Sequence, residues 1–206
     1  MSERSVLYIH GLNKGADTPQ PFEAKELAAF EVAGINAKYA FVNWARQPFE
    51  EAIDGITAEA RKLAQIGNLS VVGFSAGGSM AMNVYDRLRD LGNVTATSIA
   101  GRLSAGSFFS FSPRDLKRAT HYNGKLWYVS CYDSIRHFED EVEPTLTAYD
   151  RAKLRVIKPR LDFVVPLSTM VIEGVDTVTI PAHTHHRAGI RGLTWVRNQL
   201  AQQPAS

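Results

Sequence analysis

The chain has 206 residues, 45% of them hydrophobic and 21% charged, a composition typical of a globular protein with one core, so we expect residues 1–206 to form a single domain. A formal net charge of +2 is too small to indicate a nucleic-acid partner. No apolar run reaches the length of a membrane span, and the start MSERS lacks the regions of a signal peptide, so the cytoplasm is the expected location.

Apolar runs and helical spacings alternate through the first half of the chain. The run at Val6–Ile9 is too short for a helix and predicts a buried strand, whereas residues 49–64 place apolar side chains at three-to-four spacing and predict a helix. The elements expected in this half are a strand at Val6–Ile9, a helix at Pro21–Phe30, a strand at Ile35–Trp44, a helix at Phe49–Ala64, a strand at Leu69–Phe74 and a helix at Ala76–Leu91.

The second half continues the alternation and ends in a helix. The elements expected here are strands at Thr95–Gly101, Lys125–Cys131, Leu154–Pro159 and Asp176–Pro181, and a helix at Arg187–Gln199. Cys131 is the only cysteine, so it cannot form an internal disulfide, and we expect it to pack as a small hydrophobe. Alternating strands and helices predict an α/β fold, with a mostly parallel sheet covered by helices on both faces in three layers.

A serine between glycines links the third predicted strand to the helix after it. Gly73-Phe74-Ser75-Ala76-Gly77 has the pattern G-x-S-x-G, which is known as a nucleophile elbow when a strand precedes it and a helix follows. Such a turn holds its serine in a strained backbone conformation, and side chains at the two glycine positions would collide with the neighbouring strand and helix. A glycine-rich turn that binds phosphate or only connects two elements is the alternative interpretation.

The first predicted strand ends in the sequence YIHGLN. If Ser75 attacks a carbonyl group, a chain that turns at Gly11 can offer the backbone N–H of Leu12 to the resulting oxyanion, together with the N–H of Ala76. With its G-x-S-x-G turn and this His-Gly pair, the sequence resembles the α/β-hydrolase fold family, and the resemblance extends over nearly the whole chain. The resemblance implies a catalytic triad, with an acid after a late strand, a histidine after the last strand and a structural role for His10.

Two aspartates compete for the acid position that the resemblance implies. Asp162 lies in RLDFVVP and matches the pattern D-x-x-V-P, which is common at the acid position of that family. Asp133 follows the predicted strand Lys125–Cys131 but has no Val-Pro after it. Aspartates at strand ends are often turn residues, and that interpretation fits Asp133 better than Asp162. We therefore expect Asp162 to be the acid, with Asp133 as the alternative.

The segment TIPAHTHHRAG, between the last strand and the last helix, holds three histidines, His183, His185 and His186. Family loops of the type Pro-x-x-x-His select His185, counting back from the last helix makes His186 nearly as good, and His183 lies too close to the strand. A metal site is the minority alternative for this cluster, because the expected additional acidic or cysteine ligands are not evident in the sequence.

These observations predict a serine hydrolase that cleaves a carboxylic ester or thioester through an acyl-serine intermediate. Ser75, Asp162 and His185 would form the triad, and the N–H groups of Leu12 and Ala76 the oxyanion hole. No cofactor, metal, nucleic-acid partner or membrane span is expected, and the partner is a small-molecule ester or thioester. The alternatives are an acyltransferase or peptidase with the same triad, or a non-catalytic binding module on this fold.

The length of the chain predicts a minimal version of the fold with a small lid or none. The only segment that could cover the site is 101–122, in which three phenylalanines could line an acyl pocket or simply pack; these are Phe108, Phe109 and Phe111.

Overall fold

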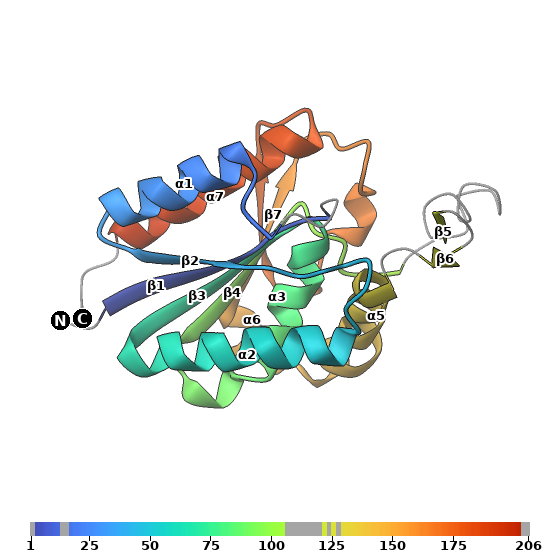
Figure 1. Ribbon diagram of the computed structural model, residues 1–206, viewed down its shortest axis with the longest axis horizontal. Helices are drawn as coiled ribbons and strands as arrows, with labels where there is room; N and C mark the ends of the chain where they lie inside the picture. The colour runs from blue at the N-terminus through green and yellow to red at the C-terminus, as the bar shows by residue number, and fades with distance from the viewer. Residues whose placement is uncertain (1–2, 13–16, 106–120, 123–124, 127–128, 203–206) are drawn as a thin grey trace.

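The computed structural model describes residues 3–12, 17–105, 121–122, 125–126 and 129–202. Their main feature is a six-stranded sheet in which every pair of neighbouring strands is parallel (Figure 1). In spatial order the strands are β2 (Asn36–Ala40), β1 (Glu3–Ile9), β3 (Gly67–Phe74), β4 (Val94–Ile99), β7 (Leu154–Pro159) and β8 (Asp176–Ile180). The predicted parallel sheet is confirmed.

Helices cover both faces of this sheet, which confirms the predicted three-layer architecture. One face carries α1 (Pro21–Val32) and α7 (His185–Gln202), and the other carries α2 (Phe49–Ile66) and α3 (Ala76–Asp86) (Figure 1). Among the helices in the described ranges, none combines the length and the apolarity that a membrane crossing requires. The remaining elements are η1 (Arg89–Leu91), β5 (His121–Tyr122), β6 (Lys125–Leu126), α5 (Val129–His137), η3 (Phe138–Val142), η4 (Glu143–Thr145), α6 (Ala148–Lys153) and η5 (Leu167–Thr169).

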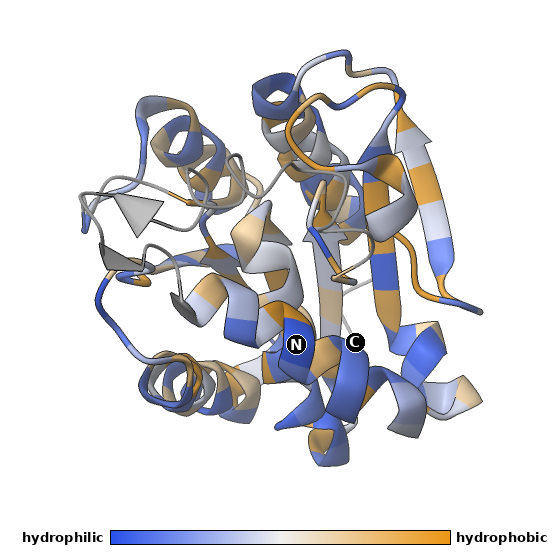
Figure 2. Ribbon diagram, turned by 90° about the vertical axis from the view of Figure 1, so that its right-hand side faces the viewer, coloured by the Kyte–Doolittle hydropathy of each residue, from blue (hydrophilic) through white to orange (hydrophobic). Residues whose placement is uncertain are grey.

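The two helical layers enclose two hydrophobic clusters, one on each face of the sheet. Successive side chains of a strand point to opposite faces, so Val6 and Tyr8 enter the cluster beneath α1 and α7, whereas Leu7 and Ile9 enter the other. All four side chains are fully buried, which explains why β1 is a continuous apolar run rather than an alternating one. The helices, by contrast, carry both hydrophilic and hydrophobic residues (Figure 2).

The predicted strand Lys125–Cys131 is wrong at its carboxyl end. Among its described residues, Lys125–Leu126 form a strand, β6, whereas Val129–Cys131 belong to the helix α5, which runs to His137. The buried positions of α5 include the small polar Ser130 and Ser134, both fully buried, beside Ile135. Ser134 hydrogen-bonds Ser79 at 3.0 Å and accepts hydrogen bonds from Asn83. Because two of its buried positions are serines, α5 has a weak apolar periodicity, the signal by which helices are recognised in sequence.

Smaller differences concern the ends of elements. The predicted helix Ala76–Leu91 stops at Asp86 and is followed by a turn and η1, while the last helix begins two residues early, at His185. The cysteine packs against the hydrophobic cluster beside α2 and α3, as expected, and burial raises the pKa of the Cys131 thiol to about 12. The three phenylalanines considered for an acyl pocket lie outside the described residues.

The strand order contains a topological switch point beside β1, where the direction in which successive strands are added to the sheet reverses. Strand β2 lies on one side of β1 and β3 lies on the other, so the connections leaving β1 and β3 run to opposite faces of the sheet. Ligands of open α/β sheets bind in the crevice outside the carboxyl ends of the strands at such a reversal. Here that crevice lies between the loop that begins at His10 and the turn at Ser75.

Candidate active site

Ser75 stands at the carboxyl end of β3 in a strained backbone conformation. Its φ of 55° and ψ of −119° are unfavourable for a side chain with a Cβ atom, and Ser75 is the N-cap of α3. Among the described residues, the only other non-glycine residue with a positive φ is Ala100. Two hydrogen bonds stabilise the turn: the Ser75 N–H donates to Ile99 O at 2.9 Å, and the Gly78 N–H donates to Ser75 O at 2.9 Å. Strain of this kind concentrates at functional sites.

The two glycines of the motif are required by close backbone contacts. A Cβ atom on Gly73 would lie 1.9 Å from Gly77 O, within the first turn of α3. A Cβ atom on Gly77 would lie 2.2 Å from Ile9 O and 2.8 Å from His10 O, at the end of β1. The predicted collisions with helix and strand are therefore confirmed, and the missing side chains let α3 begin directly against β1.

The loop after β1 reaches the serine, because a Cβ atom on Gly11 would lie 2.9 Å from the Cβ of Ser75. Two side chains hold this loop: Trp44 Nε1–H donates to Gly11 O at 3.1 Å, and His10 Nδ1 bonds the same oxygen at 2.5 Å. The second ring nitrogen of His10 accepts the N–H of Val42 at 3.0 Å. Because Nε2 accepts a hydrogen bond, this arrangement requires a neutral imidazole, and burial lowers the pKa of His10 to about 4. His10 therefore has the structural role that was expected of it.

Asp162 and His185 come together at the carboxyl ends of β7 and β8. The backbone brings the two loops side by side, because Leu161 N–H donates to Ala182 O at 3.3 Å. His185 Nδ1 lies 2.7 Å from Asp162 Oδ2, and the Asp162 side chain is fully buried. The second carboxylate oxygen, Oδ1, accepts the N–H groups of Val164 at 2.7 Å and Val165 at 3.0 Å. The carboxylate thus has a fixed orientation toward the imidazole.

The charge of this aspartate is stabilised despite its burial. Burial alone would raise the pKa of Asp162, but the hydrogen bond with His185 and those from Val165 and Val164 outweigh it and hold the pKa below its ordinary value. At neutral pH Asp162 is therefore an anion that accepts the Nδ1–H of His185. The tautomer that this bond selects has its lone pair on Nε2.

Ser75 and His185 line one cavity of about 430 Å³, whose other walls come from the loop after β1, the start of α1 and the loop after β7. The Nε2 atom of His185 is buried and has no hydrogen-bond partner among the described residues. Leu12 lines the cavity as well, and Ala76 is the first residue of α3, so its N–H has no acceptor within the helix. The full lining is Gly11, Leu12, Gln20, Phe22, Glu23, Phe74, Ser75, Val164, Thr184, His185 and His186.

The alternative site residues lie elsewhere or have other contacts. Asp133 lies within α5 rather than at the end of a strand, so the reason for considering it as the acid no longer holds. His186 lines the cavity, but its ring packs edge-on against Phe22 with a centroid separation of 4.5 Å. His183 is exposed. No group of three potential metal ligands occurs in the described part of the chain.

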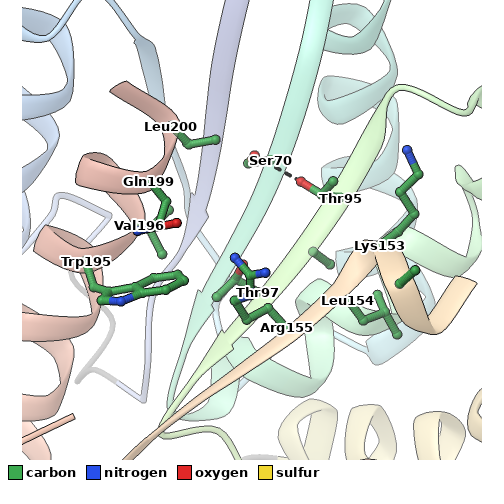
Figure 3. Close-up of a pocket in the computed structure, with 12 residues that line it drawn as sticks. Ser70, Thr95, Thr97, Lys153, Leu154, Arg155, Trp195, Val196, Gln199 and Leu200 are labelled. Atoms are coloured by element: carbon green, nitrogen blue, oxygen red, sulfur yellow. Dashed lines mark hydrogen bonds between the residues drawn. The ribbon is translucent and has the colours of Figure 1, made fainter. Parts of the chain in front are cut away.

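A second cavity, of about 170 Å³, lies at the opposite end of the sheet (Figure 3). The hydroxyl groups of Ser70 and Thr95 contact each other there at 3.0 Å, near the amino ends of β3 and β4. Arg155 lies over the ring of Trp195 on α7, 5.1 Å from its centroid. Neither Ser75 nor the loops that hold Asp162 and His185 line this cavity, so it does not belong to the candidate active site.

Comparisons with known proteins agree with this topology. Est1E from Butyrivibrio proteoclasticus is similar with a TM-score of 0.63 and 15% identity over 98% of this chain and 86% of that one. For a monoacylglycerol lipase from Paleococcus ferrophilus, the TM-score is 0.62 with 12% identity over 97% and 96%. An alpha/beta hydrolase superfamily protein from Enterococcus faecalis gives 0.57 and 14% over 98% and 91%.

The chain has the α/β-hydrolase fold. No protein-family model matches the sequence, and a search of curated proteins finds no significant match. At these identities the similarity extends to the fold alone, so the roles of individual residues rest on their geometry in this chain.

Sequence reasoning missed the walls of the cavity in this α/β-hydrolase fold. Phe22 and Glu23 reach it from the first turn of α1, and Phe74 packs against the ring of His185 with a centroid separation of 4.9 Å. Phe74 is the variable residue before the serine in the motif, and its aromatic type was the only available signal. Nothing in the sequence of α1 indicates that its first turn faces Ser75.

Proposed function

We propose that this protein is a serine hydrolase that cleaves a carboxylic ester or thioester through an acyl-serine intermediate. The observation that carries the proposal is the unpartnered Nε2 of His185, buried in the cavity that Ser75 also lines. A buried polar atom without a partner is costly, and an active site is a place where such a cost is accepted. Ser75 would be the nucleophile, His185 the base and Asp162 the acid.

The first half of the reaction would acylate Ser75. The serine oxygen attacks the carbonyl carbon while His185 Nε2 takes the hydroxyl proton, and Asp162 accepts the Nδ1–H of the resulting imidazolium. The carbonyl becomes a tetrahedral oxyanion. When that intermediate collapses, the bond to the leaving group breaks, Nε2–H protonates the departing alcohol or thiol, and the acyl group stays on Ser75.

Water completes the cycle by the same route in reverse. His185 removes a proton from water as its oxygen attacks the acyl carbon, and the acid product leaves with the serine proton restored from Nε2. The backbone N–H groups of Leu12 and Ala76 would hold the oxyanion in both halves. Gly11 suits this role because a Cβ atom there would lie 2.9 Å from the Cβ of Ser75, so a larger residue would push the loop away.

The size of the cavity limits the substrate. A volume of about 430 Å³ lies within the range of sites for small molecules and does not require a macromolecular substrate. The lining includes aromatic and aliphatic side chains on the Phe22 and Val164 sides, which suits an apolar acyl or alcohol group. One structural neighbour is named a monoacylglycerol lipase, which agrees with an ester substrate.

Hydrolysis of p-nitrophenyl esters of increasing chain length tests the proposal. The wild-type protein should release p-nitrophenol, and Ser75→Ala should reduce turnover by about a thousandfold or more without loss of folding. Ser70→Ala is the matched control, because this serine lies in β3, the strand that Ser75 follows, and hydrogen-bonds Thr95 away from the candidate active site. Equal turnover in Ser75→Ala and Ser70→Ala would exclude Ser75 as the nucleophile.

A further inference from the structure

Large apolar side chains are exposed around the buried carboxylate of Asp162. Leu161 is 41% exposed, Phe163 83% and Val164 61%. A single exposed apolar residue is ordinary, but three within four positions of one loop are an unusual concentration of exposed apolar side chains. The peptide N–H of Val164 binds Asp162 and so has a structural function. The apolar side chains at the tip contribute nothing to that bond.

The loop that carries these side chains forms part of the wall of the candidate active site through Val164. Val164 lines the cavity together with Leu12, which is itself 42% exposed and follows β1. Leu161 is joined to the loop after β8 by its hydrogen bond to Ala182 O. We call Leu12, Leu161, Phe163 and Val164 the apolar rim. It extends the cavity wall outward to the surface of the protein.

Basic side chains flank the apolar rim. Arg160 precedes it, and Arg187 and Arg191 lie in the first two turns of α7; all three are exposed. Arg191 Nη1 donates to Pro181 O, which places that guanidinium beside the loop that contacts Leu161. The segments 157–172 and 177–191 contain a single acidic residue, Asp162, whose carboxylate is buried. The exposed charge that these two segments carry is therefore positive.

We propose that the apolar rim and its arginines form a docking surface for an anionic lipid bilayer. Apolar side chains that enter the region between headgroups and acyl chains, with cations at headgroup level, are the features by which proteins bind such membranes from one side. A second copy of this chain is a poorer occupant, because a symmetric contact would place the arginines of one copy against those of the other.

Docking in this orientation would turn the cavity toward the bilayer. Val164 belongs to both the rim and the cavity wall, so an ester dissolved in the membrane could reach Ser75 along one apolar surface. This choice of substrate rests on the proposed function, whereas binding to the bilayer does not. Each arginine near an anionic surface should raise the partition coefficient about fivefold, with a further contribution of about tenfold from Phe163.

Co-sedimentation with vesicles tests the docking apart from catalysis. The Ser75→Ala protein should bind vesicles of equimolar phosphatidylcholine and phosphatidylglycerol more tightly than vesicles of phosphatidylcholine alone, and added salt should weaken the binding. In that background Phe163→Ser should reduce binding about tenfold and Arg160→Gln about fivefold. The matched controls are Val32→Ser, 91% exposed at the far end of α1, and Lys62→Gln on α2.

The outcomes separate docking from activity. The proposal is overturned if neither vesicle type binds, or if the control variants lose as much binding as the rim variants. A dimer in sedimentation velocity that Phe163→Ser dissociates, without vesicle binding, would assign the surface to a second copy instead. Phe163→Ser should still hydrolyse a short water-soluble ester at the wild-type rate. Failure of that hydrolysis in the wild-type protein would count against the proposed function, not against the docking.

Discussion

The close approach of the elbow to the end of β1 gives a sharp prediction for Gly77→Ala. The new Cβ atom would lie 2.2 Å from Ile9 O, whereas ordinary contacts of this kind begin at 3.4 Å, so α3 and β1 must separate by more than 1 Å. Both partners are backbone atoms in fixed elements, so no side chain can turn aside. We expect Gly77→Ala to lower the free energy of unfolding by about 3 kcal/mol, the upper range for overpacking. The rate of ester hydrolysis should fall as well, because the same separation moves Ser75 away from the N–H of Leu12, which would hold the oxyanion.

Gly55→Ala is the matched control for this substitution. Gly55 lies within α2, is exposed, and has no atom within 4 Å of the position that a Cβ would take. Alanine there should raise the free energy of unfolding by about 0.5–1 kcal/mol, because glycine disfavours helix interiors. Urea unfolding followed by circular dichroism measures both variants. A Gly77→Ala protein as stable as the wild type would refute the steric account of the motif.

Three further predictions concern the titratable residues. Asp162→Asn should reduce turnover by orders of magnitude, because the amide would hold the wrong tautomer of the His185 imidazole, whereas Asp133→Asn should reduce it only a few-fold. Steady-state kinetics on one ester measure both variants, and a larger loss in Asp133→Asn would contradict the assignment. His185→Ala should abolish turnover, whereas His186→Ala should chiefly raise KM, because its ring lines the cavity. The lowered pKa of His10, about 4, means that the unfolded chain takes up this proton first as pH falls through the ordinary value of 6.5. The contribution of His10 to the free energy of unfolding is therefore fully present above that value, and about 2 kcal/mol of it should be lost between about pH 8 and about pH 5. An NMR titration that shows His10 protonated in the folded protein at about pH 6 would contradict this.

Sequence patterns predicted the parts of the fold in which one residue type dominates. β1 and β3 are buried on both faces, so their apolar runs had no competing interpretation. The elbow was predictable because Gly73 and Gly77 are demanded by backbone contacts that no other residue could make. Asp162 was singled out by a family resemblance, and its hydrogen bond to His185 could not be derived from the spacing of 23 residues alone.

The parts that were missed depend on contacts between distant segments. Helix α5 contacts Ser79 and Asn83, some 50 residues away in the chain, through hydrogen bonds of Ser134. The apolar run Lys125–Cys131, which overlaps its first turn, predicted a strand instead. The cavity walls likewise need the packing of α1 against the sheet, which places Phe22 opposite His186. Neither arrangement leaves a periodic signal within its own segment.

Covalent trapping of the nucleophile tests the central claim most directly. The protein is treated with a fluorophosphonate, digested, and the modified peptide is identified by mass spectrometry. A serine activated by His185 attacks phosphorus and displaces fluoride, and the adduct then resists hydrolysis. We predict one modification per chain, on Ser75, lost in Ser75→Ala and greatly slowed in His185→Ala. An unmodified Ser75 in the folded wild-type protein, or labelling that persists in Ser75→Ala, would contradict the proposed mechanism.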